Sequence, residues 1–156
     1  MRRYEYVLDL AGPPATPPEE VLVRHPEEDD AASLAALMLD AYLDTIDYEG
    51  ESLEDARAEV AGYFGGSPLL ECSWLAIADG RPVSASLVSF WTERGCPIVS
   101  YVMTASSSKG RGLASAVLAF SLATLAEEGH REVRAGITDG NAPSEVIFRR
   151  AGFRRV

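Results

Sequence analysis

Residues 108–118, SKGRGLASAVL, place two glycines and two cations directly before a run of apolar, helix-forming residues. A strand-like run, PIVSYVMT at residues 97–104, comes just before them. A strand that leads through a glycine-rich turn into a helix gathers unpaired backbone amides at one point, where the helix dipole favours negative charge. The pattern is typical of a phosphate site, and equally of a tight turn that carries solvated cations.

The composition indicates one acidic domain. The chain has 156 residues, 47% of them hydrophobic, which is enough for one sizeable core. Its net charge of −10 argues against nucleic acid or an anionic membrane surface as a partner, because like charges repel. No run approaches the ~18 apolar residues of a membrane span, and the first ten residues lack the apolar stretch of an export signal. We therefore expect a soluble, cytoplasmic protein.

Cysteine and histidine usage gives no sign of a metal. Cys72 and Cys96 do not stand in a metal-ligand spacing, and two cysteines are too few for a disulfide framework. They are interpreted as reduced, buried thiols. His25 ends a short strand and His130 lies in a turn between a helix and a strand, so both are expected to be structural, with His130 exposed to solvent.

Alternation and helical spacing predict a mixed sheet covered by helices. An early strand is followed by a proline-rich linker, and Asp79-Gly80 is typical of a tight hairpin turn. Ser52 is a candidate cap over Asp55. The expected strands are residues 4–10, 21–25, 72–79, 81–91, 97–104, 132–138 and 152–156, and the expected helices are residues 30–43, 52–64, 113–125 and 142–151.

At this point the sequence resembles the GNAT family of acyl-CoA-dependent N-acyltransferases. The phosphate motif of that family reads Q/R-x-x-G-x-G/A, and residues 109–114 read KGRGLA. Family members also carry an asparagine, an aromatic residue seven positions later and then Gly-Phe, which correspond here to Asn141, Phe148, Gly152 and Phe153. The resemblance covers residues 21–156, taken as the acetyltransferase domain, and leaves residues 1–20 as an N-terminal strand and linker.

The resemblance implies an α/β (α+β) GNAT fold that holds acetyl-CoA between two parallel strands that splay apart, residues 98–104 and 132–138. The pantetheine arm then pairs with the main chain of the first strand, and the diphosphate rests on amides at the start of the following helix. The coenzyme residues implied are Val102, Met103, Thr104, Lys109, Gly110, Arg111, Gly112, Leu113, Ala114, Asn141 and Phe148.

Two positions depart from the family pattern. Active relatives usually carry tyrosine where this chain has Phe148, and a phenyl ring cannot protonate the departing thiolate. Because general acid catalysis contributes ~10²–10⁴-fold and a thiol of pKa near 8.5 leaves readily, we expect weakened rather than abolished catalysis. The central strand also lacks the carboxylate that many members use as a base. The candidates for the base are Tyr101, Ser100, Glu93, Asp44, Asp47 and Glu49.

The acceptor site is expected between the first two helices. Residues 27–59 hold twelve acidic residues and a single basic one, Arg57. A negative field there attracts a cationic amine, although the same pattern is also typical of two solvated helix faces. The candidate acceptor residues are Tyr42, Asp44, Asp47 and Tyr48.

These inferences predict an enzyme that moves an acetyl group from acetyl-CoA to a primary amine of a small molecule or peptide, by direct attack in a ternary complex. The alternatives are a catalytically silent acyl-CoA binding or sensing domain and a purely structural interaction domain. The early strand is expected to cover the exposed sheet edge, either within one chain of a monomer or across a homodimer.

Overall fold

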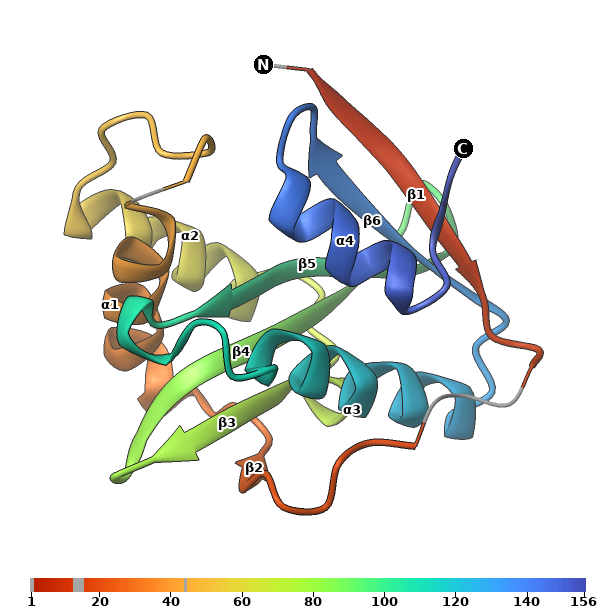
Figure 1. The fold of residues 1–156 in the computed structure, drawn as a ribbon, viewed down its shortest axis with the longest axis horizontal. Helices are drawn as coiled ribbons and strands as arrows, with labels where there is room; N and C mark the ends of the chain where they lie inside the picture. Colours follow the sequence, from red (N-terminus) through yellow and green to blue (C-terminus); the bar gives the residue numbers. More distant parts are fainter. Residues whose placement is uncertain (1, 13–15, 44) are drawn as a thin grey trace.

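The computed structural model describes residues 2–12, 16–43 and 45–156. Its strands form one seven-stranded sheet in the order β2-β3-β4-β5-β6-β1-β7 (Figure 1). The strands are β1 (Arg3–Asp9), β2 (Val23–Arg24), β3 (Trp74–Ala78), β4 (Arg81–Trp91), β5 (Cys96–Thr104), β6 (Glu132–Thr138) and β7 (Arg154–Arg155). The helices are α1 (Ala31–Tyr42), α2 (Leu53–Gly65), α3 (Leu113–Glu127) and α4 (Ala142–Arg150), with short 3-10 helices at Glu28–Asp30, Leu70–Cys72 and Ser106–Ser108.

Helices cover both faces of this sheet. Leu87 packs with the buried residues of α1 and α2, whereas the next residue, Val88, packs with those of α3 and α4. Because successive side chains of a strand point to opposite faces, the two helix pairs lie on opposite sides of β4. Figure 1 shows α3 and α4 together on one side of the sheet. The expected mixed sheet flanked by helices is confirmed.

The strands β5 and β6 are parallel and pair only at one end. Their register is limited to Ile98 with Arg134 and Val99 with Ala135, so the two strands diverge beyond that point. The other neighbouring strands in the described sheet are antiparallel. An irregularity in the β4–β5 register leaves Ser100 without an opposite residue. The predicted splay is therefore confirmed, and a bulge in β5 lies where it begins.

The strand β1 runs antiparallel to β6 along its whole length, from Arg3 opposite Thr138 to Asp9 opposite Glu132. Its other edge pairs with β7, and the amide of Val156 donates to the Glu5 carbonyl over 2.9 Å. The N-terminal strand thus covers β6 within the same chain, and both termini lie at this end of the sheet (Figure 1).

The predicted local signals are confirmed where they depend on near neighbours. Ser52 caps α2 by accepting from the Asp55 amide, and Asp79 and Gly80 make the turn between β3 and β4. Four expectations need correction. β2 and β7 are each only two residues long, Leu113 is half-buried rather than part of the buried helix face, and His130 is half-buried rather than exposed. None of the helices in the described part of the chain is long and apolar enough to cross a membrane.

Both cysteines are free and buried, as expected. Burial raises the pKa of the Cys72 thiol from 9.0 to about 12. It also raises the pKa of Tyr63 from 10.0 to about 12, against the opposing effect of a 2.7 Å hydrogen bond between its hydroxyl and Ser73 Oγ. These groups remain protonated in the folded protein at a pH where the unfolded chain has already lost the corresponding protons.

Stability is therefore expected to fall as the pH rises above about 9. Because the folded state then holds more protons than the unfolded state, each group lowers the free energy of unfolding by up to about 1.4 kcal/mol per pH unit. Urea unfolding between pH 7 and 11 measures the slope. Cys72→Ala should flatten it between pH 9 and 10, whereas an equal slope in both proteins would contradict the assignment to this thiol.

Candidate functional site

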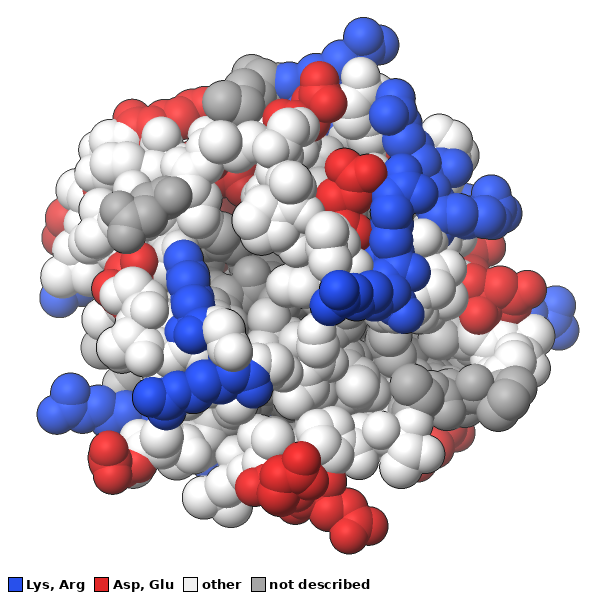
Figure 2. Space-filling model, viewed as in Figure 1, with Lys and Arg blue, Asp and Glu red and all other residues white. Residues whose placement is uncertain are grey.

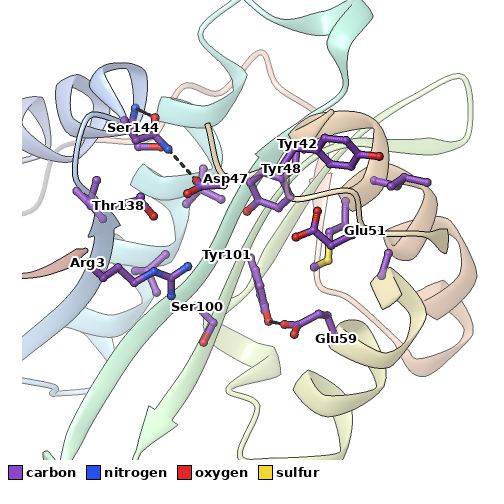
Figure 3. Close-up of a pocket in the computed structure, with 18 of the residues that line it drawn as sticks. Arg3, Tyr42, Asp47, Tyr48, Glu51, Glu59, Ser100, Tyr101, Thr138 and Ser144 are labelled. Carbon is purple, nitrogen blue, oxygen red and sulfur yellow. Dashed lines mark hydrogen bonds between the residues drawn. The ribbon is translucent and has the colours of Figure 1, made fainter. Parts of the chain in front are cut away.

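A cavity of about 520 Å³ opens where β5 and β6 diverge. Its walls come from α1, the connection between α1 and α2, α2, β5, the end of β6 and the start of α4 (Figure 3). The lining includes Arg3, Tyr42, Asp47, Tyr48, Glu51, Asp55, Glu59, Ser100, Tyr101, Val102, Gly136, Thr138, Asn141, Ser144 and Phe148. Segments that are distant in the sequence therefore meet at one site.

The glycine-rich turn before α3 has the backbone geometry of an anion site. Gly110 and Gly112 have φ values of +83° and +75°, a region that L side chains rarely adopt, and no atom outside the turn lies within 4 Å of either missing Cβ. No side chain caps α3, and the amide of Ala116 is the first to reach back to the Gly112 carbonyl. The amides of Leu113 and Ala114 precede that bond and lack helical partners. The turn therefore presents unpaired donors at the positive end of a helix.

Two polar side chains fasten this turn to α1. Lys109 Nζ donates to the Ala41 carbonyl over 3.0 Å, and Ser106 donates to Asp40 through both its amide and its hydroxyl at 2.8 Å. Lys109 thus holds the turn in place, while Arg111 is exposed beside the first amides of α3. Figure 2 shows basic side chains gathered over this turn, and a second basic group over α4 and the C-terminal strand.

The β5 residues expected to hold the coenzyme differ in whether their side chains reach the cavity. Val102 lines the cavity, whereas the side chains of Met103 and Thr104 are buried. The Thr104 hydroxyl lies 2.9 Å from Ser84 Oγ, which also donates to the Met103 carbonyl over 3.0 Å. At Met103 and Thr104 only the main chain is available for a ligand.

Asn141 joins α4 to the opposite wall. Its Oδ1 accepts from the Ser144 amide over 3.2 Å, which confirms the expected helix cap, and its Nδ2 donates to Asp47 Oδ2 over 3.0 Å. Asp47 therefore reaches across the cavity from the connection between α1 and α2 (Figure 3). This bond closes one side of the site.

Phe148 is both a core residue and a cavity wall. It is buried, packs edge-to-face on Phe153 with ring centroids 5.0 Å apart, and also lines the cavity. Its ring provides shape without any proton donor. Gly152, with φ +104°, ends α4 just before Phe153 and so allows this pair to form.

Tyr101 and Glu59 form a hydrogen-bonded pair on the face of β5 that is covered by α1 and α2. The Tyr101 hydroxyl donates to Glu59 Oε2, and both residues line the cavity (Figure 3). Burial raises the pKa of Tyr101, and the hydrogen bond to Glu59 raises it further, so the phenol stays neutral at ordinary pH. Glu59 was not among the predicted candidates. Its only sequence signal was its place in the acidic run, which does not say which way each side chain faces.

Some of the remaining predicted acceptor and base residues line the cavity and others do not. Tyr42, Asp47 and Tyr48 line the cavity, and burial raises the pKa of Tyr42 to about 12, with Asp47 adding to the effect. Glu93 lies in the turn between β4 and β5, at the opposite end of β5 from the divergence, and does not line the cavity. Glu49 is exposed and also does not line it. Asp44 lies outside the described residues.

Neither histidine lines the cavity. The His25 ring lies 3.9 Å from that of Trp74, and its Nδ1 is 3.0 Å from the Ser73 carbonyl. Across the residues with assigned positions, no group of three or more His, Cys, Asp or Glu side chains is arranged to hold a metal ion.

Known proteins share this architecture. The chain superimposes on a GCN5-related N-acetyltransferase from Sphaerobacter thermophilus with a TM-score of 0.77 at 20% identity, covering 99% of this chain and 48% of that one. It also matches diaminobutyrate acetyltransferase EctA from Paenibacillus lautus, solved with its substrate and coenzyme A, with a TM-score of 0.62 at 23% identity over 83% of this chain and 72% of that one. At these identities the likeness shows the fold.

A sequence relative gives a closer local match. Mycothiol acetyltransferase from Clavibacter sepedonicus is 50% identical over 44 residues, which are 28% of this chain and 14% of that protein. The two matches thus cover less than half the length of the Sphaerobacter and Clavibacter proteins. Residues 20–154 match the model of the acetyltransferase (GNAT) domain. The chain therefore belongs to the GNAT acetyltransferase family, whose acyl donor is acetyl-CoA.

Proposed function

We propose that the protein transfers an acetyl group from acetyl-CoA to the primary amine of a small molecule, by direct attack in a ternary complex. The observation that carries the proposal is the uncapped start of α3, with two positive-φ glycines, placed beside strands whose divergence opens into a cavity. The amides of Leu113 and Ala114, with Arg111 nearby, offer a diphosphate local favourable charge in a chain whose net charge is −10.

The donor enters from the α3 and α4 side of the sheet. Val102, Asn141 and Phe148 line the cavity along that path, and the splay exposes main-chain groups of β5 to the pantetheine arm. Amides near Val102 and Met103 would polarise the thioester carbonyl and stabilise its developing oxyanion. The bulge at Ser100 redirects this part of the strand.

Tyr101 and Glu59 supply the proton path. An aminium must lose one proton before its nitrogen attacks the carbonyl carbon, and the attacking nitrogen loses another as the C–S bond breaks. A neutral Tyr101 hydroxyl can accept a proton from nitrogen while passing its own to Glu59, which is exposed and releases the first proton to solvent before it takes the second. The thiolate leaves with the bonding electron pair and takes a proton from water, because Phe148 has none to give. Attack is direct, since neither Cys72 nor Cys96 lines the cavity.

A thiol-release assay tests this function. Purified protein with acetyl-CoA and a panel of primary amines should release free CoA in proportion to the acetylated amine, identified by mass spectrometry. Phe148 favours one other candidate, a silent acyl-CoA binding domain. Nanomolar to micromolar binding of acetyl-CoA without thiol release for any amine would support that candidate, and no rise in melting temperature at saturating acetyl-CoA would contradict both.

A further inference from the structure

Arg3 enters the acceptor side of the cavity from the N-terminal strand. The β1–β6 register sets it opposite Thr138, and its side chain lies over Gly136, where a Cβ would be 3.4 Å from Arg3 Cδ. Glycine at position 136 therefore leaves room for the Arg3 stem to lie along β6 and carry its guanidinium into the cavity. Figure 3 shows this side chain approaching from the wall opposite to Glu51 and Tyr42.

The nearest carboxylate on the same face of β1 is already engaged. Glu5 accepts from Arg94 at 3.0 Å and pairs with Arg134 at 3.2 Å. Arg2, the preceding residue of the chain, lies instead over the ring of Tyr4, 5.5 Å from its centroid. Among the residues that the structure places, Arg3 has no carboxylate within ion-pair distance. Its guanidinium is thus available to a ligand in the cavity.

The cavity carries opposite charges on its two sides. Asp47, Glu51, Asp55 and Glu59 come from the connection between α1 and α2 and from α2, whereas Arg3 comes from β1. Burial raises the pKa values of Tyr42 and Tyr101, and the Arg3 charge partly offsets this rise at both hydroxyls. The guanidinium is therefore within electrostatic range of the two tyrosines that face the acceptor.

We propose that Arg3 binds the carboxylate of the acceptor, which is a small diamino acid. This inference rests on the proposed function and names its substrate class. In this arrangement the carboxylate pairs with the planar guanidinium, one ammonium lies against the acidic wall, and the other amine is directed at the thioester. Arg3 is a specificity residue that contacts the substrate without taking part in proton transfer.

Matched amines that differ only by the carboxylate test this assignment. The pairs are lysine with 1,5-diaminopentane, ornithine with 1,4-diaminobutane, and 2,4-diaminobutyrate with 1,3-diaminopropane. With the unmodified protein, kcat/KM should be higher for the amino acid in at least one pair. In Arg3→Gln that advantage, measured as the ratio of kcat/KM for the amino acid to kcat/KM for its matched diamine, should fall roughly 10- to 100-fold, the loss typical of a charge-assisted contact.

Two further variants distinguish an effect of the Arg3 charge from a general effect of changing this strand. Arg2→Gln removes the neighbouring charge outside the cavity and should leave the preference intact, whereas Arg3→Lys should keep part of it. An equal loss for both members of each pair, or no loss at all, would overturn the inference while leaving acetyl transfer in place.

Equilibrium titration of the CoA-bound protein with the same amino acids gives an answer even without turnover. Weaker binding in Arg3→Gln than in the unmodified protein would support the site. Absence of amino-acid binding to the unmodified protein would refute it independently of catalysis.

Discussion

Replacing Tyr101 with phenylalanine is expected to lower kcat by about 10²–10⁴-fold, the usual contribution of a positioned acid or base. The phenyl ring keeps the shape of the cavity and removes the hydroxyl that donates to Glu59. Because the change affects proton transfer and not the glycine-rich turn before α3, the KM for acetyl-CoA should change little. Steady-state kinetics with the best amine measures both parameters.

Glu59→Gln probes the other half of the pair. It should lower kcat by a similar factor, and the double variant should be little worse than either single one, because the two groups act as a unit. Glu93→Gln is the matched control, since Glu93 is an acid outside the cavity, and it should keep full activity. Full activity in Tyr101→Phe, or strictly multiplicative losses in the double variant, would rule out the relay.

Replacing both Gly110 and Gly112 with alanine is expected to weaken CoA binding by about 30- to 1,000-fold. An L residue in the left-handed region costs about 1–2 kcal/mol, so the turn will relax in the free protein. The coenzyme must then restore two strained residues to bring the amides of Leu113 and Ala114 together. Isothermal titration with CoA measures the dissociation constant.

Gly129→Ala is the matched control for this experiment. Gly129 has φ +86° beyond the C-terminal end of the same helix, with nothing within 4 Å of its missing Cβ. The variant should lose comparable stability per substitution and keep the CoA affinity. If the double variant at the turn bound CoA as tightly as Gly129→Ala does, the amides of this turn would not form the diphosphate site.

Several features of the site could be predicted from short stretches of sequence. The turn before α3 needs two glycines within three residues, the cap of α4 needs Asn141 three residues before Ser144, and the end of α4 needs Gly152. Each depends on backbone dihedrals or on a hydrogen bond between residues a few positions apart. Such interactions are encoded locally, so the residue types were sufficient to locate them.

The positions of Glu59 and Glu93 could not be predicted from such local signals. Both are acids near candidate positions, but the rotation of α2 about its axis brings Glu59 to the Tyr101 hydroxyl, whereas the hairpin between β4 and β5 carries Glu93 to the far end of the strand. Lys109 was expected at the coenzyme, and in the structure its ammonium donates a hydrogen bond to the Ala41 carbonyl. The rotation of each helix about its axis and the packing of the elements decide where these three side chains lie. Neither can be inferred from residues that are close in the sequence.

Residue types and their spacing were enough to predict the order of the elements, the glycine turn, the caps and membership in a family that uses acetyl-CoA. Which charges face one another in the cavity depends on how the distant segments pack. Arg3 and Glu59 are separated by more than fifty residues and approach the same space because β1 pairs with β6 and α2 packs over β5. Register and helix packing are cooperative properties of the whole core, so the electrostatics of the acceptor site follow from the fold rather than from any local pattern.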